Sequence, residues 1–285
     1  RAKQVYDWLW SKNLHSIDEM TNLSKDLREK LSEAFIINPI SVDLLQKSKD
    51  GTIKNGVKLH DGLMVESVLI PTESRTTACV SSQVGCSLNC EFCATAKLKR
   101  MRNLEVAEIV DQVALIDKQS KLYFDRPLSN IVFMGMGEPM MNYKNVVDAI
   151  KKITDEDGLG MSARRITVST SGIPKMMRML ADENLKVKLA LSLHSAIEHK
   201  RNEIMPFSTK FPLTEIMEAM QYWYSKTENR ITFEYCVWKG INDGDEDIKA
   251  LIKYCRQVPC KVNLIQYNPI GEGKFDHRSV EAEER

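Results

Sequence analysis

The sequence predicts an α/β protein in which helices alternate with parallel strands. From residue 106 onward, apolar residues recur at helical spacing in five segments, and short apolar runs separate these segments. Connections of that length imply right-handed βαβ crossovers and therefore a parallel sheet. Counting an earlier segment at 76–80 as the first, the sequence predicts six strands, which fit either an open doubly wound sheet or a barrel left partly open. Both arrangements place the ligand site at the carboxyl ends of the strands.

Composition indicates a folded protein. The 285 residues are 43% hydrophobic and 28% charged, which is ordinary for a globular chain that buries a core. The sequence contains no apolar run of transmembrane length and no signal-peptide pattern, so we expect a cytoplasmic protein with no membrane partner. An odd number of cysteines suits a reducing compartment. The net charge of +1 means that any nucleic-acid surface must be local.

Residues 1–37 predict a small helical domain. Ser16 and Glu19 have the spacing of a capping box. The cations of the second helix, Lys25, Arg28 and Lys30, are either a solvated face or a surface that contacts phosphates. The apolar faces of the two helices comprise Val5, Trp8, Leu9, Leu23, Leu27, Leu31 and Phe35.

Residues 38–75 predict a β-rich linker. Three dipeptides in this region, Asp50-Gly51, Asn55-Gly56 and Asp61-Gly62, are typical of tight hairpin turns. We therefore expect a small antiparallel element between the helical domain and the α/β core.

Residues 76–285 predict the α/β core. Strands are expected at 76–80, 130–134, 165–169, 188–193, 230–237 and 261–267. Helices are expected around 106–116, 146–150, 174–180, 213–220 and 248–252.

Three cysteines follow the first core strand. Cys86, Cys90 and Cys93 have the spacing C-x3-C-x2-C, which predicts a metal or cluster site. A structural zinc requires four ligands, and no second C-x-x-C or H-x3-5-H pair lies downstream. A four-iron cluster held by three thiolates leaves one iron open. An open iron is a place for a substrate or cofactor to bind.

Polar and glycine-rich motifs follow the later strands. Each motif taken alone is also typical of a strand-end cap or turn, but their convergence on one rim favours a binding site. The motifs are Gly135-Met-Gly-Glu-Pro139, Ser169-Thr-Ser-Gly172, Ser192-Leu-His194 and Asn268-Pro269.

These motifs, in this order, resemble the radical S-adenosylmethionine superfamily and, more narrowly, its RlmN/Cfr family of RNA adenine-C2 methyltransferases. Residues 65–67, 79–86 and 262–269 also match the family, and the resemblance extends from the helical domain to the last strand. The Trp-containing first helix and Glu19-Met-Thr21 look closer to the housekeeping branch than to the antibiotic-resistance branch. The resemblance implies an incomplete (β/α)6 barrel of the radical SAM type.

The resemblance also implies cofactors. Cys86, Cys90 and Cys93 would hold three irons of a [4Fe-4S] cluster, and S-adenosylmethionine would chelate the fourth. An electron from the cluster then cleaves the sulfonium to give a 5′-deoxyadenosyl radical. Gly137 and Glu138 match the segment that receives the amino group of the cofactor. The family's other cofactor contacts match Ser169, Ser192, Leu193, His194 and Asn268.

The family reaction uses two cysteines outside the cluster. An acceptor cysteine is methylated, its methylene radical adds to C2 of adenine, and a second cysteine forms a disulfide with the acceptor to release the product. Cys79 matches this second cysteine, and Glu66 matches the proposed proton acceptor. The alternatives are a small buried side chain for Cys79 and a salt-bridged strand residue for Glu66.

The family's acceptor cysteine lies beyond the last strand in an Ala-Cys-Gly setting. The sequence stops at Arg285 without one, so either the native chain continues or this homologue cannot methylate. Residues 279–285 look like the start of a helix, and we therefore expect the native chain to continue. Structural roles are expected for Cys236, Cys255 and Cys260.

The predicted function is methylation of an adenosine in 23S rRNA and in certain tRNAs by a monomeric enzyme, with an electron donor such as flavodoxin. The basic stretches 97–102 and 164–165 either meet RNA phosphates or are solvated loops. One alternative is a radical SAM enzyme with another substrate. The other is an inactive RNA-binding or maturation factor in which the cluster is structural.

Overall fold

The structure, a computed structural model, describes residues 1–267 and 270. The chain divides into two compact units by its packing. The first comprises residues 1–84, 103–135 and 144–166, and the second comprises residues 85–102, 136–143 and those from 167 onward. No helix among the described residues has the length and hydropathy needed to cross a bilayer.

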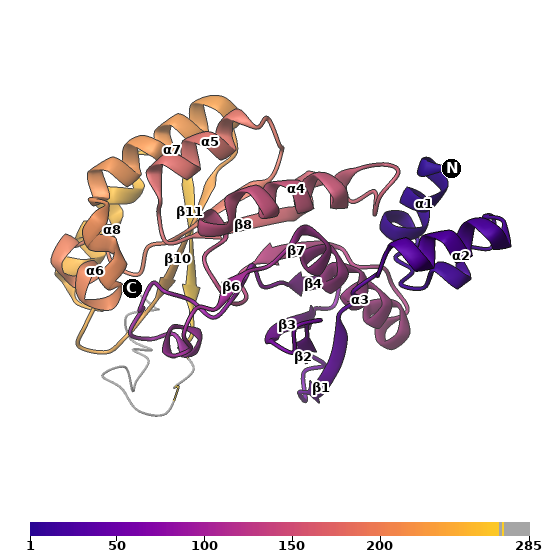
Figure 1. Cartoon of the computed structure of the whole chain (residues 1–285). Coiled ribbons are helices and arrows are strands. Elements are labelled where there is room, and N and C mark those ends of the chain that lie inside the picture. Colours follow the sequence, from indigo (N-terminus) through magenta and orange to yellow (C-terminus); the bar gives the residue numbers. More distant parts are fainter. Residues whose placement is uncertain (268–269, 271–285) are drawn as a thin grey trace. The chain divides into compact units, whose positions relative to one another are not determined.

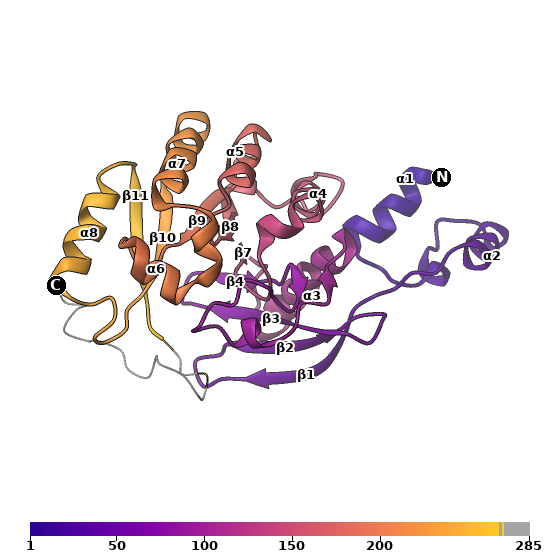
Figure 2. The ribbon, with the colours of Figure 1, turned by 60° about the vertical axis from the view of Figure 1, so that its left-hand side comes forward.

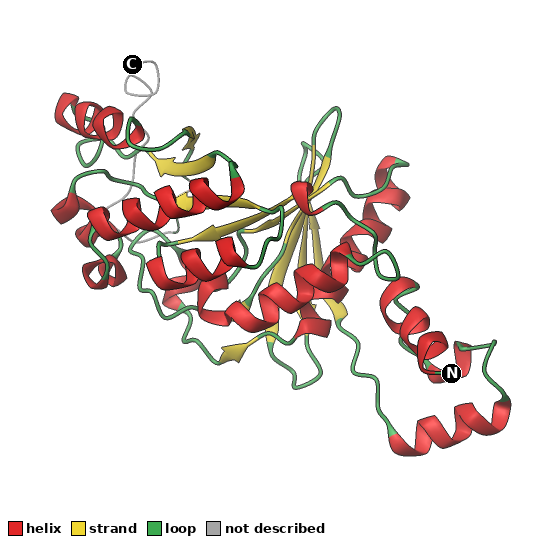
Figure 3. Cartoon of the chain, turned by 90° about the horizontal axis from the view of Figure 1, so that it is seen from above, coloured by secondary structure: helices red, strands yellow, loops and turns green. Residues whose placement is uncertain are grey.

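The first unit begins with short helical segments, shown in red near the N label of Figure 3. They are α1 (Ala2–Tyr6), the π-helix η1 (Asp7–Ser11), the 3-10 turn η2 (Ile17–Glu19) and α2 (Lys25–Ala34). Trp8, Met20 and Leu23 form their small buried core. The predicted capping box is wrong, because only a single 3-10 turn follows Ser16 and its side chain makes no cap hydrogen bond. Ser24 caps α2 instead, and its Oγ accepts the N–H of Leu27 at 3.3 Å.

Three antiparallel strands follow: β1 (Ser41–Lys47), β2 (Ile53–Lys58) and β3 (Met64–Pro71) (Figure 1). The predicted turns at Asp50-Gly51 and Asp61-Gly62 are confirmed. The predicted turn at Asn55-Gly56 is wrong, since both residues lie inside β2. Asn55 is fully buried and exchanges amide hydrogen bonds of 3.0 and 2.7 Å with Gln119. A buried amide pair therefore replaces the turn that the dipeptide suggests.

The same unit contains the first parallel strand pair. β4 (Thr76–Cys79) pairs antiparallel with β3 and parallel with β7 (Asn130–Phe133), so the strand order in this unit is β1-β2-β3-β4-β7. α3 (Val106–Phe124) forms the crossover, and a capping box between Glu105 and Glu108 starts it. α4 (Tyr143–Thr154) follows β7. The shorter elements are β5 (Gln83–Val84), β6 (Arg102–Asn103) and η5 (Ala163–Arg165).

The second unit is a run of parallel strands in the order β8-β9-β10-β11. Figure 2 shows α5, α7 and α8 following one another along these strands. The elements are η3 (Ala94–Lys97), η4 (Pro139–Asn142), β8 (Ile166–Thr170), α5 (Pro174–Asp182), β9 (Lys188–Ser192), α6 (Glu198–Ile204), η6 (Pro206–Lys210), α7 (Leu213–Thr227), β10 (Ile231–Cys236), α8 (Asp245–Cys255) and β11 (Cys260–Ile265).

The predicted α/β class and the positions of the core strands and helices are confirmed. The sequence did not predict α6. Its residues are mainly charged, and its buried face carries Arg201 where an apolar residue would normally lie. Apolar periodicity therefore fails to reveal this helix.

Candidate active site

The three cysteines lie on a loop that begins at Gly85. This glycine has φ +73°, and a Cβ there would come within 2.3 Å of the carbonyl oxygen of Lys99. Only glycine lets the two ends of the loop approach so closely. Within the loop, the N–H of Cys93 donates to the carbonyl of Cys90 at 3.1 Å. The local backbone therefore brings Cys90 and Cys93 together in a short turn.

The thiols influence one another electrostatically. Burial raises the pKa of Cys90, and the nearby Cys93, Cys86 and Glu138 raise it further. Burial also raises the pKa of Cys86, with Cys93 and Glu138 acting in the same direction. A cluster binds thiolates, so loading this site releases protons. Within the described part of the chain, no three His, Cys, Asp or Glu side chains are placed to share one metal ion.

The glycines of the Gly-Glu-Pro segment allow its backbone conformation, and one buried carboxylate holds the segment in place. A Cβ on Gly135 would lie 2.8 Å from the main chain of Val80, and Gly137 has φ +94°. Glu138 is buried; its Oε1 accepts the N–H of Met140 at 3.1 Å and its Oε2 accepts the N–H of Ser171 at 2.8 Å. Burial raises the pKa of Glu138, and these donors oppose the rise. Glu138 thus ties its segment to the loop after β8.

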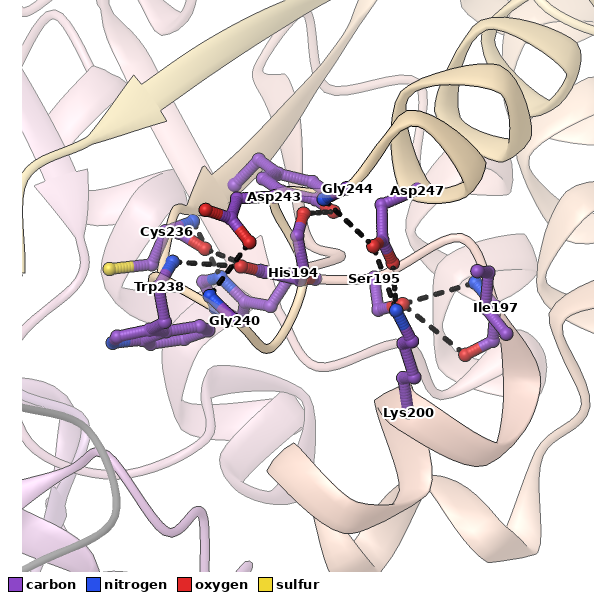
Figure 4. A network of polar contacts seen from close by, with 12 residues as sticks. His194, Ser195, Ile197, Lys200, Cys236, Trp238, Gly240, Asp243, Gly244 and Asp247 are labelled. Carbon is purple, nitrogen blue, oxygen red and sulfur yellow. Dashed lines mark hydrogen bonds and ion pairs between the residues drawn. The ribbon is translucent and has the colours of Figure 1, made fainter. Parts of the chain in front are cut away.

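His194 follows β9 and is held from several sides (Figure 4). It has φ +55° and is buried. Its Nδ1 accepts the N–H of Cys236 at 3.1 Å, and its carbonyl accepts Nδ2 of Asn242 at 2.7 Å. Burial, followed by the charge of Arg201, lowers the pKa of His194 to about 3. The ring is therefore neutral, with its proton on Nε2.

His194 also contacts the cysteine loop. Its ring lies 4.7 Å from that of Phe92, which in turn lies 5.2 Å from the ring of Trp238. Cys90 and Phe92 pack on a core that includes Met205 and Trp238. This aromatic packing shields one side of the loop from water.

α6 and α8 are joined near the same rim. Lys200 Nζ lies 2.8 and 2.7 Å from the two carboxylate oxygens of the buried Asp247 (Figure 4). In the turn before α6, Ser195 Oγ accepts the N–H of Ile197 at 3.1 Å. These bonds fix the start of α6 after the Ser-Leu-His motif.

Sequence reasoning missed Arg201. This side chain is fully buried, and its Nη2 donates to the carbonyls of Ser171 and Ser192, the latter at 3.3 Å. No pattern marks it, because its neighbours in sequence are charged and typical of a solvated helix.

Most of the residues predicted for cofactor binding lie in the second unit. Ser169 is buried near the end of β8, and Ser192 ends β9. The N–H of Leu193 donates to the carbonyl of Glu234 at 3.0 Å. Asn268 lies outside the described residues.

The two other predicted catalytic residues belong to the first unit. Cys79 ends β4, and although part of the residue reaches solvent, burial raises the pKa of its thiol to about 12. Glu66 is exposed on β3, with its Oε1 3.0 Å from Lys54 Nζ. The catalytic roles of both residues stay predictions. Cysteines throughout the described part of the chain are free thiols.

The second unit combines a loop of three cysteines with polar residues at the ends of parallel strands that alternate with helices. We compared this arrangement with known enzyme families. Residues 80–255 match the sequence profile of the radical SAM superfamily. The superfamily takes its name from S-adenosylmethionine, and its members combine this cofactor with a [4Fe-4S] cluster. Residues 1–37 match the N-terminal domain of a ribosomal RNA large subunit methyltransferase.

Curated relatives narrow the class. The chain is 66% identical over 99% of its length to a probable dual-specificity RNA methyltransferase RlmN of Flavobacterium psychrophilum, and it covers 81% of that protein. It is 45% identical to the dual-specificity RNA methyltransferase RlmN of Geotalea uraniireducens over 94% of this chain and 76% of that one. This chain belongs to the RlmN family of radical SAM RNA methyltransferases.

Solved structures agree on the fold. The crystal structure of a radical SAM methyltransferase from Sphaerobacter thermophilus matches with a TM-score of 0.93 and 38% identity, over 99% of this chain and 83% of that one. The [FeFe]-hydrogenase maturase HydG matches with a TM-score of 0.52 and 15% identity over 68% of this chain and 43% of that one, which reflects the shared fold alone. The predicted radical SAM fold is confirmed.

Proposed function

We propose that the protein methylates C2 of an adenosine in 23S rRNA and in certain tRNAs. The observation that carries the proposal is the convergence, within one unit, of three mutually interacting cysteines, the buried Glu138 and the rim after β8 and β9. The RNA substrate is supported by relatives named dual-specificity RNA methyltransferases. The choice of C2 of adenine as the methylated position follows from the family resemblance of the motifs.

The residues of the second unit fit the implied cofactors. Thiols are the ligands that iron–sulfur clusters take, and Cys86, Cys90 and Cys93 would hold this one. The buried Arg201 has two nitrogens, Nε and Nη1, with no hydrogen-bond partner among the described residues, which suits an anionic group nearby. S-adenosylmethionine would bind along Gly137, Glu138, Ser169, Ser192, Leu193, His194 and Asn268. When bound, the two cofactors supply radical chemistry that ordinary side chains lack.

The chain's own residues then orient and protect the site. Glu138 holds the Gly-Glu-Pro segment against the loop after β8, so the backbone meant for the cofactor is fixed in advance. The neutral His194 ring and Phe92 pack together beside the cysteines, and this apolar contact excludes water.

Cys79 and Glu66 have roles outside the cofactor site in this proposal. Cys79 resolves the protein–RNA crosslink by forming a disulfide with the family's acceptor cysteine. Its raised pKa keeps it a thiol at neutral pH, so a base must remove its proton before it reacts. Glu66 accepts the proton from C2, and this role requires it to leave its ion pair with Lys54.

The loop after the cysteines is the proposed RNA contact within the second unit. Lys97 and Lys99 are exposed there, together with Leu98 and Met101. Cations position a nucleic acid through its phosphates, and apolar side chains contact unstacked bases. The proposal further includes a flavodoxin-type electron donor and a monomeric protein that works in the cytoplasm.

The N-terminal cations favour the solvated-face interpretation. Lys30 Nζ lies 2.9 Å from Asp26 and Lys25 Nζ lies 3.8 Å from Glu29, both within exposed helical pairs. Arg28 donates to the main-chain carbonyl of Asp18. Local partners therefore already engage all three cations.

The test uses a protein that carries the family's acceptor cysteine. It is reconstituted anaerobically with iron and sulfide and then incubated with S-adenosylmethionine, a reductant and either 23S rRNA fragments or tRNA. We expect 5′-deoxyadenosine together with C2-methyladenosine in the RNA, measured by mass spectrometry. Cofactor cleavage without RNA methylation would favour another substrate. RNA binding with intact S-adenosylmethionine would favour a structural cluster. Zinc without iron or sulfide would exclude both radical SAM functions, the RNA methyltransferase and the enzyme with another substrate.

A further inference from the structure

Arg201 is a buried cation with part of its hydrogen-bonding capacity unused. It has 0% exposure, and its Nη2 donates to the carbonyls of Ser171 and Ser192. Neither Nε nor Nη1 finds a hydrogen-bond partner among residues 1–267 and 270. A guanidinium carries five N–H donors, and leaving such donors buried and unpaired is costly. A residue kept in this state needs an acceptor or a counter-charge.

No carboxylate in the described part of the chain forms an ion pair with Arg201. Glu198, one helical turn earlier, acts on the guanidinium only at longer range, and its Oε2 accepts the N–H of Leu213 at 2.9 Å. A buried charge without a direct partner is strongly unfavourable. Further compensation is therefore expected from the cysteine loop or from what the loop holds.

α6 places Arg201 beside that loop. The N–H of Glu91 donates to the carbonyl of Ile204 at 3.1 Å, at the end of the helix that carries Arg201. Cys90 packs against the core that contains Ile204. One short helix thus joins the loop that holds the ligands to the guanidinium.

We propose that Arg201 is a positioning residue that supplies the positive counter-charge of the thiolate-held cluster and raises the cluster's reduction potential. The inference rests on the proposed ligation of the cluster by Cys86, Cys90 and Cys93. Reduction adds a negative charge to a cluster that is already anionic with its thiolates, so a buried cation stabilises the reduced form more than the oxidised form. N–H donors directed at the sulfurs act in the same direction.

The experiment compares the wild-type protein with Arg201→Lys and Arg201→Gln. Each protein is reconstituted anaerobically and assayed for iron and sulfide. Its midpoint potential is then measured without S-adenosylmethionine, by a redox titration followed by electron paramagnetic resonance. We expect the midpoint potential to be highest in the wild type, lower in Arg201→Lys and lowest in Arg201→Gln. Lysine keeps the positive charge but lacks the planar set of N–H donors of a guanidinium.

Lys175→Gln is the control. It removes an exposed cation of the same unit, at the start of α5. We expect this variant to keep the wild-type potential. A shift as large as that of Arg201→Gln would overturn the specific role of Arg201.

Other outcomes separate this inference from the proposed function. A wild-type protein that binds no cluster contradicts the proposed function itself. A fully loaded Arg201→Gln protein with unchanged potential overturns only the counter-charge, and a weakened dissociation constant for S-adenosylmethionine would then assign the guanidinium to the cofactor's carboxylate. If the variants fail to fold, wild-type protein with ¹⁵N-labelled arginine guanidinium decides the matter. We expect a ¹⁵N hyperfine coupling to the reduced cluster, and its absence overturns the proposal.

Discussion

At the scale of single residues, the fold stabilises the neutral form of the His194 ring. Its Nδ1 is occupied by the N–H of Cys236, and burial lowers its pKa to about 3 from an ordinary value of 6.5. Between these two pH values the unfolded chain binds the proton and the folded chain does not. Stability must therefore fall as the pH decreases through that range.

Urea unfolding of the metal-free protein between pH 7 and pH 4 measures this effect. We expect the wild-type protein to lose up to about 1.4 kcal/mol per pH unit more than His194→Gln. His199→Gln, at an exposed position, is the control and should retain the wild-type slope. Identical slopes in all three proteins would show that His194 is not held neutral.

The cysteines make a second prediction at this scale. Cys90→Ser should fold but retain almost no iron or sulfide after anaerobic reconstitution, because a serine hydroxyl is a poor substitute for a cluster thiolate. Cys255→Ser should load normally, since Cys255 lies at the end of α8 and outside the loop. Iron and sulfide assays check this. Full loading of Cys90→Ser would remove Cys90 from the ligand set.

Residues with a chemical signature could be singled out from the sequence, and residues defined by their surroundings could not. The spacing of the cysteines marks the loop that is proposed to hold the cluster, and the structure shows Glu138 buried and accepting backbone N–H groups. Arg201 has no signature, because a buried arginine and a solvated one look alike in a charged segment. Asn242, which donates to the carbonyls of His194 and Cys236, is likewise visible only in three dimensions.

At the scale of elements, glycines determine how the cysteine loop closes. Gly85→Ala should cost about 1–3 kcal/mol and reduce iron retention, because its φ is +73° and a Cβ would come within 2.3 Å of the Lys99 carbonyl oxygen. Gly240 has the same φ but nothing within 4 Å of a Cβ. Gly240→Ala should therefore cost only the left-handed penalty, about 1–2 kcal/mol, and leave loading intact.

Unfolding free energies and iron content of the two glycine variants check this prediction. Equal loss of iron in both variants would mean that backbone strain in general, rather than the close approach at Gly85, explains the effect.

The loop after the cysteines provides a prediction about RNA. The double variant Lys97→Glu and Lys99→Glu should weaken RNA binding and lower the slope of log affinity against log salt by about 1–2, since each lost phosphate contact removes about 0.7–0.9. Lys249→Glu, at an exposed position of α8, should bind RNA as the wild-type protein does. Filter binding at several salt concentrations measures both. Unchanged binding by the double variant would identify these lysines as a solvated loop.

Turns could be predicted from the sequence where local residue chemistry alone determines the backbone. The turns at Asp50-Gly51 and Asp61-Gly62 lie between strands, as their chemistry suggests. Asn55-Gly56 has the same chemistry, yet the buried amide pair with Gln119 keeps it inside β2. That contact joins residues far apart in sequence, so local reasoning cannot detect it.

At the scale of the whole molecule, the order of elements was predictable because, α6 apart, each main helix and strand of the core has its own apolar period. The division into two compact units was not, since each unit is assembled from several separate stretches of chain. Residues 80–255 match the radical SAM profile, and residues 1–37 match a methyltransferase N-terminal domain. Both matches therefore point to the same kind of enzyme.

Methyl transfer to RNA is tested most directly by an anaerobic assay of cluster-loaded protein that carries the acceptor cysteine, with RNA and isotopically labelled S-adenosylmethionine. We expect 5′-deoxyadenosine and labelled C2-methyladenosine in the RNA, and the loss of both in Cys90→Ser. A loaded protein that binds RNA but leaves S-adenosylmethionine intact under reducing conditions would contradict the proposed function.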